Sequence, residues 1–338
     1  MRSTVRNILL SLLVGGFFLW LAIRNVPIDT LLGYLDGISY GWIIPYFIIS
    51  MTANYLRAER WRLLIYQGKK PSRGTLFAGV MLGYVVNYAV PRLGEITRCV
   101  YVAKKEDLSG TNLVGTVILE RVIDLLVMLI LVSTVAVVII SDVSILTNLF
   151  GDETWNYIKS LIQLQTLLIV GGSLIVILGL GYLTVRIIRQ SAPNRPWMNN
   201  MIKKARHVFH TFVDGLFSIR HLRYWPYFIG LTLLIWLGYV LLAYIPFYVF
   251  NLQNEYGLGL IDALVIMSIA SIGVALPSPG GIGTYHWFVS QGLLLLYGVP
   301  LAVGLAYAFV SHAVMMGITI LFTPILLIWN NWLQRKMF

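Results

Sequence analysis

The hydrophobic positions of this chain gather in long runs and do not alternate regularly with polar positions. A helix that crosses a bilayer needs about 20 mostly apolar residues. Runs that approach or exceed this length lie at 8–23, 38–56, 113–140, 161–185, 225–250 and 301–329. Two more apolar stretches are interrupted, 75–90 with 95–103 and 258–276 with 281–297. The pattern predicts an all-α polytopic membrane protein.

Composition strengthens this prediction. The chain has 338 residues, of which 58% are hydrophobic and 12% charged, whereas soluble domains carry roughly 25% charged residues. The run at 8–23 ends in Ala22-Ile23-Arg24 without a small-residue cleavage pattern, so we expect an anchor and not a signal peptide. The single cysteine, Cys99, excludes an internal disulfide, and we predict neither a metal nor a cofactor.

The charges predict a topology. The net charge is +11, but the basic residues flank apolar runs and form no compact basic face, so nucleic acid is not the expected partner. The basic segments 57–73 and 186–223 are expected on the cytoplasmic side, and the acidic segments 141–160 and 251–257 outside. We therefore predict a multi-pass protein of the cell (inner) membrane with both termini in the cytoplasm.

The order of elements repeats along the chain. Residues 38–140 and 225–329 each read as span, broken hairpin, span. The sides assigned to the loops agree with the number of membrane crossings only if each hairpin enters and leaves on the same side. The first hairpin would enter from the cytoplasm and the second from outside. This predicts one transmembrane domain over 1–338, an inverted-repeat helical bundle with two Pro/Gly-broken, re-entrant hairpins. A plain turn between two full spans is the alternative for each break.

Between the repeats, residues 197–220 place basic residues opposite apolar ones at helical spacing. We predict a basic amphipathic helix along the inner leaflet, where anionic lipid would attract it. A simple linker helix is the alternative.

The first break combines positive charge with exposed backbone. Pro91 and Gly94 interrupt the helix, and the helix that restarts there would point free N–H groups at an anion such as phosphate. Arginine adds a planar fork that suits phosphate. The candidate binding residues are Asn87, Arg92, Glu95 and Arg98. Alternatively, Glu95 only caps the helix start and Arg98 extends to the membrane interface.

The span at 113–140 carries three charged residues near its start. Each would cost roughly 2.5–3.5 kcal/mol in the bilayer without a partner. Glu120 and Asp124 share a helix face, and Arg121 could pair with Asp124 at a spacing of three. The three residues form either a structural ion pair or part of a ligand site.

The second break contains no charged side chain, so mainly its backbone groups could bind a ligand. Its candidate residues are Pro279, Gly280, Gly281, Tyr285 and His286. No Lys-Ser/Thr follows the glycines, which excludes a nucleotide-binding loop. His286 and His312 lie in apolar arms, where histidine is either packed and hydrogen-bonded or part of a proton relay.

Three motifs in this order, Asn87 to Arg98, Leu119 to Asp124 and Pro277 to Gly283, resemble the transmembrane domain of lysylphosphatidylglycerol synthases and related flippase-like proteins. The resemblance implies a protein that moves, or helps to move, a lipid with a charged or phosphate head group between leaflets. In bifunctional relatives a soluble domain follows and transfers lysine from its tRNA to phosphatidylglycerol. Because this chain ends at Phe338, we expect no synthase activity and no enzyme. Many relatives have an acidic residue where this chain has Tyr285-His286.

The predicted function is flippase-like binding or translocation of an amphiphile with an anionic head group, such as a phospholipid, an aminoacylated lipid or a polyprenyl-phosphate. The expected head-group contacts are Arg92, Arg98 and Arg121, balanced by Glu95, Glu120 and Asp124. The alternative is a non-transporting accessory subunit of a membrane glycosyltransferase or lipid-modifying enzyme. A third interpretation is an intramembrane transferase with Glu120, Asp124 or His286 as its base.

Overall fold

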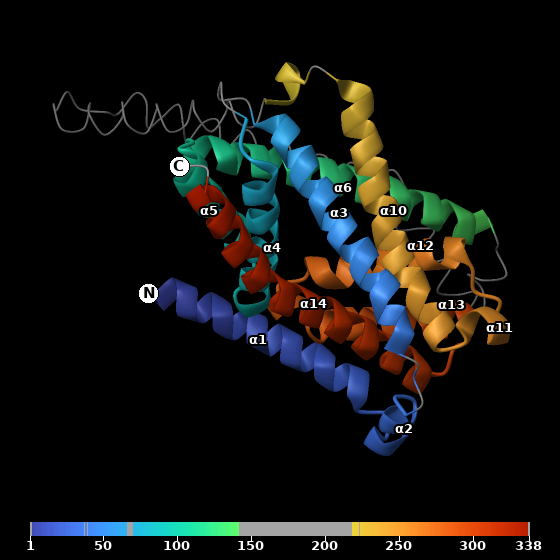
Figure 1. Cartoon of the computed structure of the whole chain (residues 1–338). Coiled ribbons are helices and arrows are strands. Elements are labelled where there is room, and N and C mark those ends of the chain that lie inside the picture. Colours follow the sequence, from blue (N-terminus) through green and yellow to red (C-terminus); the bar gives the residue numbers. More distant parts are fainter. Residues whose placement is uncertain are drawn as a thin grey trace, which may run out of the picture. The chain divides into compact units, whose positions relative to one another are not determined.

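The computed structural model of the chain is helical, and it describes residues 2–36, 38, 40–65, 70–141, 218–222 and 224–336 (Figure 1). Contacts between Cα atoms divide the chain into two compact units, residues 1–133 with 211–338, and residues 134–210. Apart from the last turns of α6, every helix described below belongs to the first unit.

The predicted continuous spans that fall within the described residues are all helices. They are α1 (Arg2–Ile23), α3 (Ile43–Leu64), α6 (Gly110–Ser141), α10 (Trp225–Val249) and α14 (Leu301–Lys336). Short elements connect them, namely α2 (Ile28–Gly33), η1 (Tyr40–Trp42), η2 (Ser218–His221) and α11 (Leu252–Glu255). By length and composition, Trp225–Val249 and Leu301–Trp332 could each cross a membrane. The predicted span 161–185 and most of the predicted basic helix 197–220 lie outside the described residues.

Both predicted breaks interrupt helices. The first hairpin consists of α4 (Arg73–Ala89) and α5 (Leu93–Glu106), and the second of α12 (Leu260–Ala275), η3 (Pro279–Gly281) and α13 (Thr284–Tyr297). Proline disfavours the helical conformation of the residue before it. Accordingly, Val90 before Pro91 and Leu276 before Pro277 both have extended backbone angles and end α4 and α12.

The extent of α3 corrects one prediction. The expected span was 38–56, but the helix begins at Ile43 and continues to Leu64. Its last turns therefore include Arg57 and Arg60, which are 4% and 0% exposed. The helix extends beyond the apolar run because these two side chains find carboxylate partners inside the fold.

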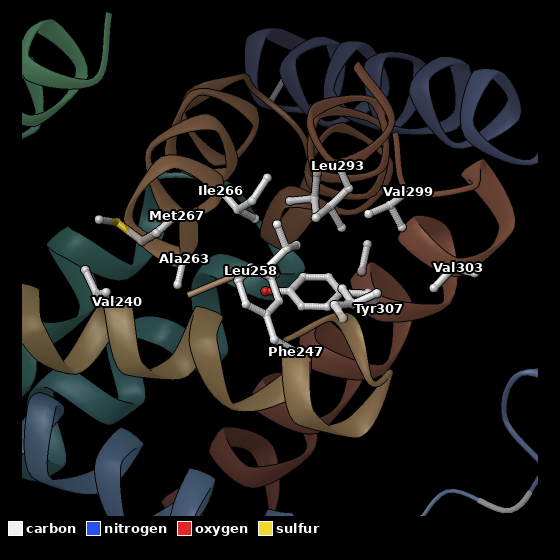
Figure 2. Packing of buried hydrophobic residues seen from close by; sticks show 13 residues of the cluster. Val240, Phe247, Leu258, Ala263, Ile266, Met267, Leu293, Val299, Val303 and Tyr307 are labelled. Atoms are coloured by element: carbon white, nitrogen blue, oxygen red, sulfur yellow. The ribbon is translucent and has the colours of Figure 1, made fainter. Parts of the chain in front are cut away.

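Each predicted repeat contains an apolar core. The core of the first is built from α3, α4, α5 and α6, including the fully buried Trp61 and Leu76. The core of the second lies among α10, α12, α13 and α14 (Figure 2). At its centre the rings of Phe247 and Tyr307 lie 5.6 Å apart, and the Tyr307 hydroxyl donates a hydrogen bond to the carbonyl of Ala243.

Helices of the two repeats also pack against each other. α3 lies beside α10, where Gly238 and Ala53 meet closely enough that a Cβ on Gly238 would be 3.1 Å from that of Ala53 (Figure 1). Small residues allow such close helix crossings in membrane proteins. α14 contacts both α4 and α13, and α1 contacts α13 and η3. The two broken hairpins are thereby held in one packed unit.

Candidate functional site: a buried ion-pair network beside the first break

Two arginines reach the site from α3. Arg57 and Arg60 are three residues apart, so they lie on neighbouring positions of one helix face. The Arg57 side chain donates a hydrogen bond to the hydroxyl of Tyr239 on α10 (Nη1 to Oη, 2.9 Å). Both arginines point at carboxylates on α6.

α6 supplies those carboxylates from Glu120 and Asp124, which share a helix face as predicted. Arg57 binds both of them, with Nε 2.7 Å from an oxygen of Glu120 and Nη2 2.7 Å from an oxygen of Asp124. Arg60 binds Asp124 at 2.6 Å and approaches Glu120 at 3.5 Å. Glu120 is completely buried. These bonds replace the water that the four charges lose on burial.

A third arginine enters the network from α5, just after the first break. Nη2 of Arg98 lies 2.9 Å from the second carboxylate oxygen of Glu120. Its guanidinium also lies over the ring of Trp61, 4.7 Å from the centroid, a favourable contact between a cation and an aromatic face. Arg98 is only 3% exposed. The alternative in which Arg98 extends outward to the membrane interface is therefore wrong.

Arg121 and Glu95 form a separate ion pair. Nη2 of Arg121 lies 2.7 Å from an oxygen of Glu95, and the two side chains are 43% and 24% exposed. Of the pairings that the spacing allowed, that of Arg121 with Asp124 does not form, because Asp124 binds Arg57 and Arg60. Arg121 lies on a different face of α6 from Glu120 and Asp124, and it turns toward the start of α5.

These side chains surround a small cleft with an empty volume of about 210 Å³, including its open mouth. Its lining residues are Arg57, Val80, Gly83, Tyr84, Asn87, Gly94, Glu95, Arg98 and Arg121. Asn87 Oδ1 accepts a hydrogen bond from the backbone N–H of Gly94 at 2.7 Å, which joins the end of α4 to the start of α5. A Cβ on Gly94 would collide with the carbonyl of Gly83, so glycine is needed for this close approach.

Positive charge is in excess around the cleft. The network and the Glu95–Arg121 pair together contain four arginines and three carboxylates, which leaves one positive charge without a carboxylate. Within the part of the chain that the structure describes, Nε of Arg98 is buried without a hydrogen-bond partner. The cleft lining combines three arginines, Arg57, Arg98 and Arg121, with one carboxylate, Glu95, and this excess of positive charge suits an anion.

Arg92 lies apart from the cleft lining. It has a left-handed backbone conformation with φ of 67°, and its side chain is exposed. The sequence predicted that Arg92, Arg98 and Arg121 contact the same head group. In the structure Arg98 and Arg121 line the cleft and Arg92 does not.

The second break lies next to the first. The Cβ atom of Tyr88, at the end of α4, would be 3.6 Å from a Cβ on Gly280. His312 Nε2 lies 3.0 Å from the carbonyl oxygen of Gly280, and His286 Nδ1 accepts a hydrogen bond from the N–H of Gly283 at 3.2 Å. Pro279, Gly281 and His286 are buried, and Tyr285 bonds Ser311. Both histidines are therefore packed and hydrogen-bonded, with ring centroids 5.0 Å apart.

Seven residues of the cleft lining and the network were not predicted as site residues. They are Arg57, Arg60, Val80, Gly83, Tyr84, Gly94 and Tyr239. Two features of the sequence could have indicated the arginines. They continue the apolar helix before them at a spacing of three, and the intramembrane carboxylates Glu120 and Asp124 needed cationic partners.

Long apolar helices around a buried ion-pair network define an integral membrane protein of the all-helical class. A model of the family described as "Lysylphosphatidylglycerol synthase TM region" matches residues 8–322, and the chain belongs to this family. A UPF0104 membrane protein of Methanocaldococcus jannaschii is 23% identical over 128 residues, which are 37% of this chain and 38% of that protein. The similarity thus spans about two fifths of the relative's length.

Proposed function

We propose that the protein binds the anionic head group of a membrane lipid in the cleft beside the first break and moves that lipid between the leaflets. The excess of one arginine over the carboxylates carries this proposal, because a phosphate would supply the missing negative charge. Arg98 and Arg121 line the cleft and have the forked geometry that phosphate accepts.

The cleft is small and open. Its empty volume of about 210 Å³ includes the space at its mouth, so the phosphate of a lipid would bind there, beside the accessible guanidinium of Arg121. The acyl chains would remain in the bilayer.

The arrangement of the breaks supports movement of the lipid. In transporters with inverted repeats, broken helices meet around a central site, and one repeat moves against the other. Here the end of α4 contacts η3 through Tyr88 and Gly280, and each repeat has a core that could move as a unit. We extend the proposal to two re-entrant hairpins in inverted repeats, in the cell membrane, with both termini in the cytoplasm.

Reconstitution tests this proposal. The purified protein is placed in liposomes with fluorescent phosphatidylglycerol, and dithionite quenching measures how fast lipid leaves the inner leaflet. The variant Arg121→Gln should move the lipid about tenfold more slowly or worse, since a hydrogen bond to a charged group contributes roughly 1.5–3 kcal/mol. Arg73→Gln is the matched control, because Arg73 is also an exposed arginine in an ion pair but lies outside the cleft.

Two results would contradict the proposal. Liposomes with the parent protein that move lipid no faster than empty liposomes would favour the non-transporting accessory role. Equal rates for Arg121→Gln and Arg73→Gln would place the head-group site elsewhere.

A further inference from the structure

The Glu95–Arg121 ion pair differs from the rest of the network in its exposure. The side chains of Arg57, Arg60, Arg98, Glu120 and Asp124 are between 0% and 16% exposed. Arg121 and Glu95, at 43% and 24%, are the accessible members. An ion pair that water reaches contributes little stability. This pair can therefore open without disturbing the buried network.

The bonding of Glu95 is also incomplete. Both oxygens of Glu120 bind arginines, Oε1 with Arg57 and Oε2 with Arg98. Glu95 uses Oε1 for Arg121, while its Oε2 is buried and has no hydrogen-bond partner among the described residues. A buried carboxylate oxygen without a donor is unfavourable. Among the described residues, Arg121 is therefore the ion-pair partner of this carboxylate, and Oε2 adds no hydrogen bond.

Glu95 and a bound phosphate would need the same guanidinium. Both partners of the pair line the cleft, and Glu95 lies on the first turn of α5, three residues after the left-handed residue Arg92. While the carboxylate holds Arg121, that part of the cleft already contains an anion. When the carboxylate leaves, the cleft gains one more uncompensated positive charge.

We infer that Glu95 is an internal substitute for the anionic head group: it binds Arg121 when the cleft is empty and is displaced when a phosphate enters. This rests on the proposed function, since it assumes that the cleft binds an anion. Glu95 is then a positioning and specificity residue that competes with the ligand. It weakens the resting affinity, and it returns Arg121 to a paired state after the lipid leaves.

The variant Glu95→Gln tests the competition through equilibrium binding. Purified protein in detergent is titrated with dihexanoyl-phosphatidylglycerol by calorimetry, and inorganic phosphate in a parallel titration reports whether the phosphate group alone suffices. Removing the competing charge should tighten lipid binding about two- to fivefold, the range expected for a partly exposed ion pair. Glu95→Asp keeps the charge and should bind nearly as the parent does. Glu255→Gln removes an exposed carboxylate outside the cleft and should change nothing.

A second substitution separates competition from other roles of Glu95. In the Arg121→Gln background the gain from Glu95→Gln should disappear, because the two anions no longer share a guanidinium. If Arg121→Gln weakens binding while Glu95→Gln leaves it equal or weaker, with the melting temperature of the parent, the competition is refuted and the proposed function stands. If neither substitution changes binding, the anionic head-group site itself is refuted.

Discussion

Glu120 is the residue on which the buried network depends. It binds arginines from two other helices, Arg57 of α3 and Arg98 of α5, and it is completely buried. A buried ion pair is weak evidence for stability, because desolvation offsets much of the attraction. Removing one partner is nevertheless costly, since the remaining charges stay buried and uncompensated. Glu120 therefore specifies how α3, α5 and α6 come together.

We predict that Glu120→Gln lowers the free energy of unfolding by about 3–5 kcal/mol, the range for a buried pair that loses one partner. Thermal unfolding in detergent, followed by tryptophan fluorescence, measures the effect. Glu255→Gln, which removes an exposed carboxylate on α11, is the control and should change the stability by less than about 0.5 kcal/mol. Equal melting temperatures for the two variants would show that Asp124 alone neutralises the arginines.

At the scale of elements, the start of α13 depends on a side chain that looked functional in the sequence. The ring nitrogen Nδ1 of His286 accepts the N–H of Gly283, the residue before the helix. The ring of His286 also packs on that of Phe309, with ring centroids 4.3 Å apart. Backbone N–H groups at a helix start need such partners, especially where water is scarce. His286 thereby defines where the second break ends.

Substitution of His286 tests this capping role. His286→Ala should lower the stability by about 1 kcal/mol from the lost cap, with a further loss from the packing against Phe309. His286→Asn should recover part of the loss, because its side-chain oxygen can accept the same N–H. The measurement is the melting temperature in detergent. If Asn and Ala are equally destabilising, packing alone explains the position of His286.

At the scale of the whole molecule, the contact between the two breaks joins the first hairpin to the second. Tyr88 lies against Gly280, and its hydroxyl donates to Thr319 of α14 at 3.3 Å. His312 of α14 contacts the carbonyl of Gly280. α14 therefore contacts both breaks, and under the proposed function any movement of one predicted repeat against the other would change these contacts.

A cross-link tests both the contact and its movement. The Cβ separation of 3.6 Å between Tyr88 and Gly280 lies within the range of about 3.5–4.5 Å for disulfides. With Cys99 replaced by alanine, Tyr88→Cys and Gly280→Cys together should form a disulfide on mild oxidation, and each alone should not. Under the proposed function the disulfide stops lipid movement in liposomes, and reductant restores it.

Two results would count against this prediction. Failure to cross-link would mean that the breaks do not meet in the membrane. Unchanged transport in the oxidised protein would mean that lipid moves without separation of the breaks. The left-handed backbone at Gly280 adds strain to any cysteine there, so the single Gly280→Cys variant must be shown to fold.

The helices and their breaks follow from local physics, and the sequence predicts them well. Apolar runs of sufficient length become helices whatever they pack against, and Pro91 and Pro277 end α4 and α12 through the steric effect of proline on the preceding residue. The shared face of Glu120 and Asp124 also follows from helical periodicity. The family motifs added an expectation about lipid head groups that composition alone could not supply.

Only the tertiary structure decided which charges bind each other. Helical spacing allowed Arg121 to pair with its neighbour Asp124, but Arg121 binds Glu95 of another helix, and Asp124 binds Arg57 and Arg60. The sequence shows how charges are spaced on one helix, whereas ion pairs between helices depend on rotation and packing, which the apolar cores determine. The same applies to Tyr88 and Gly280, which are 192 positions apart in the sequence and in contact in the fold.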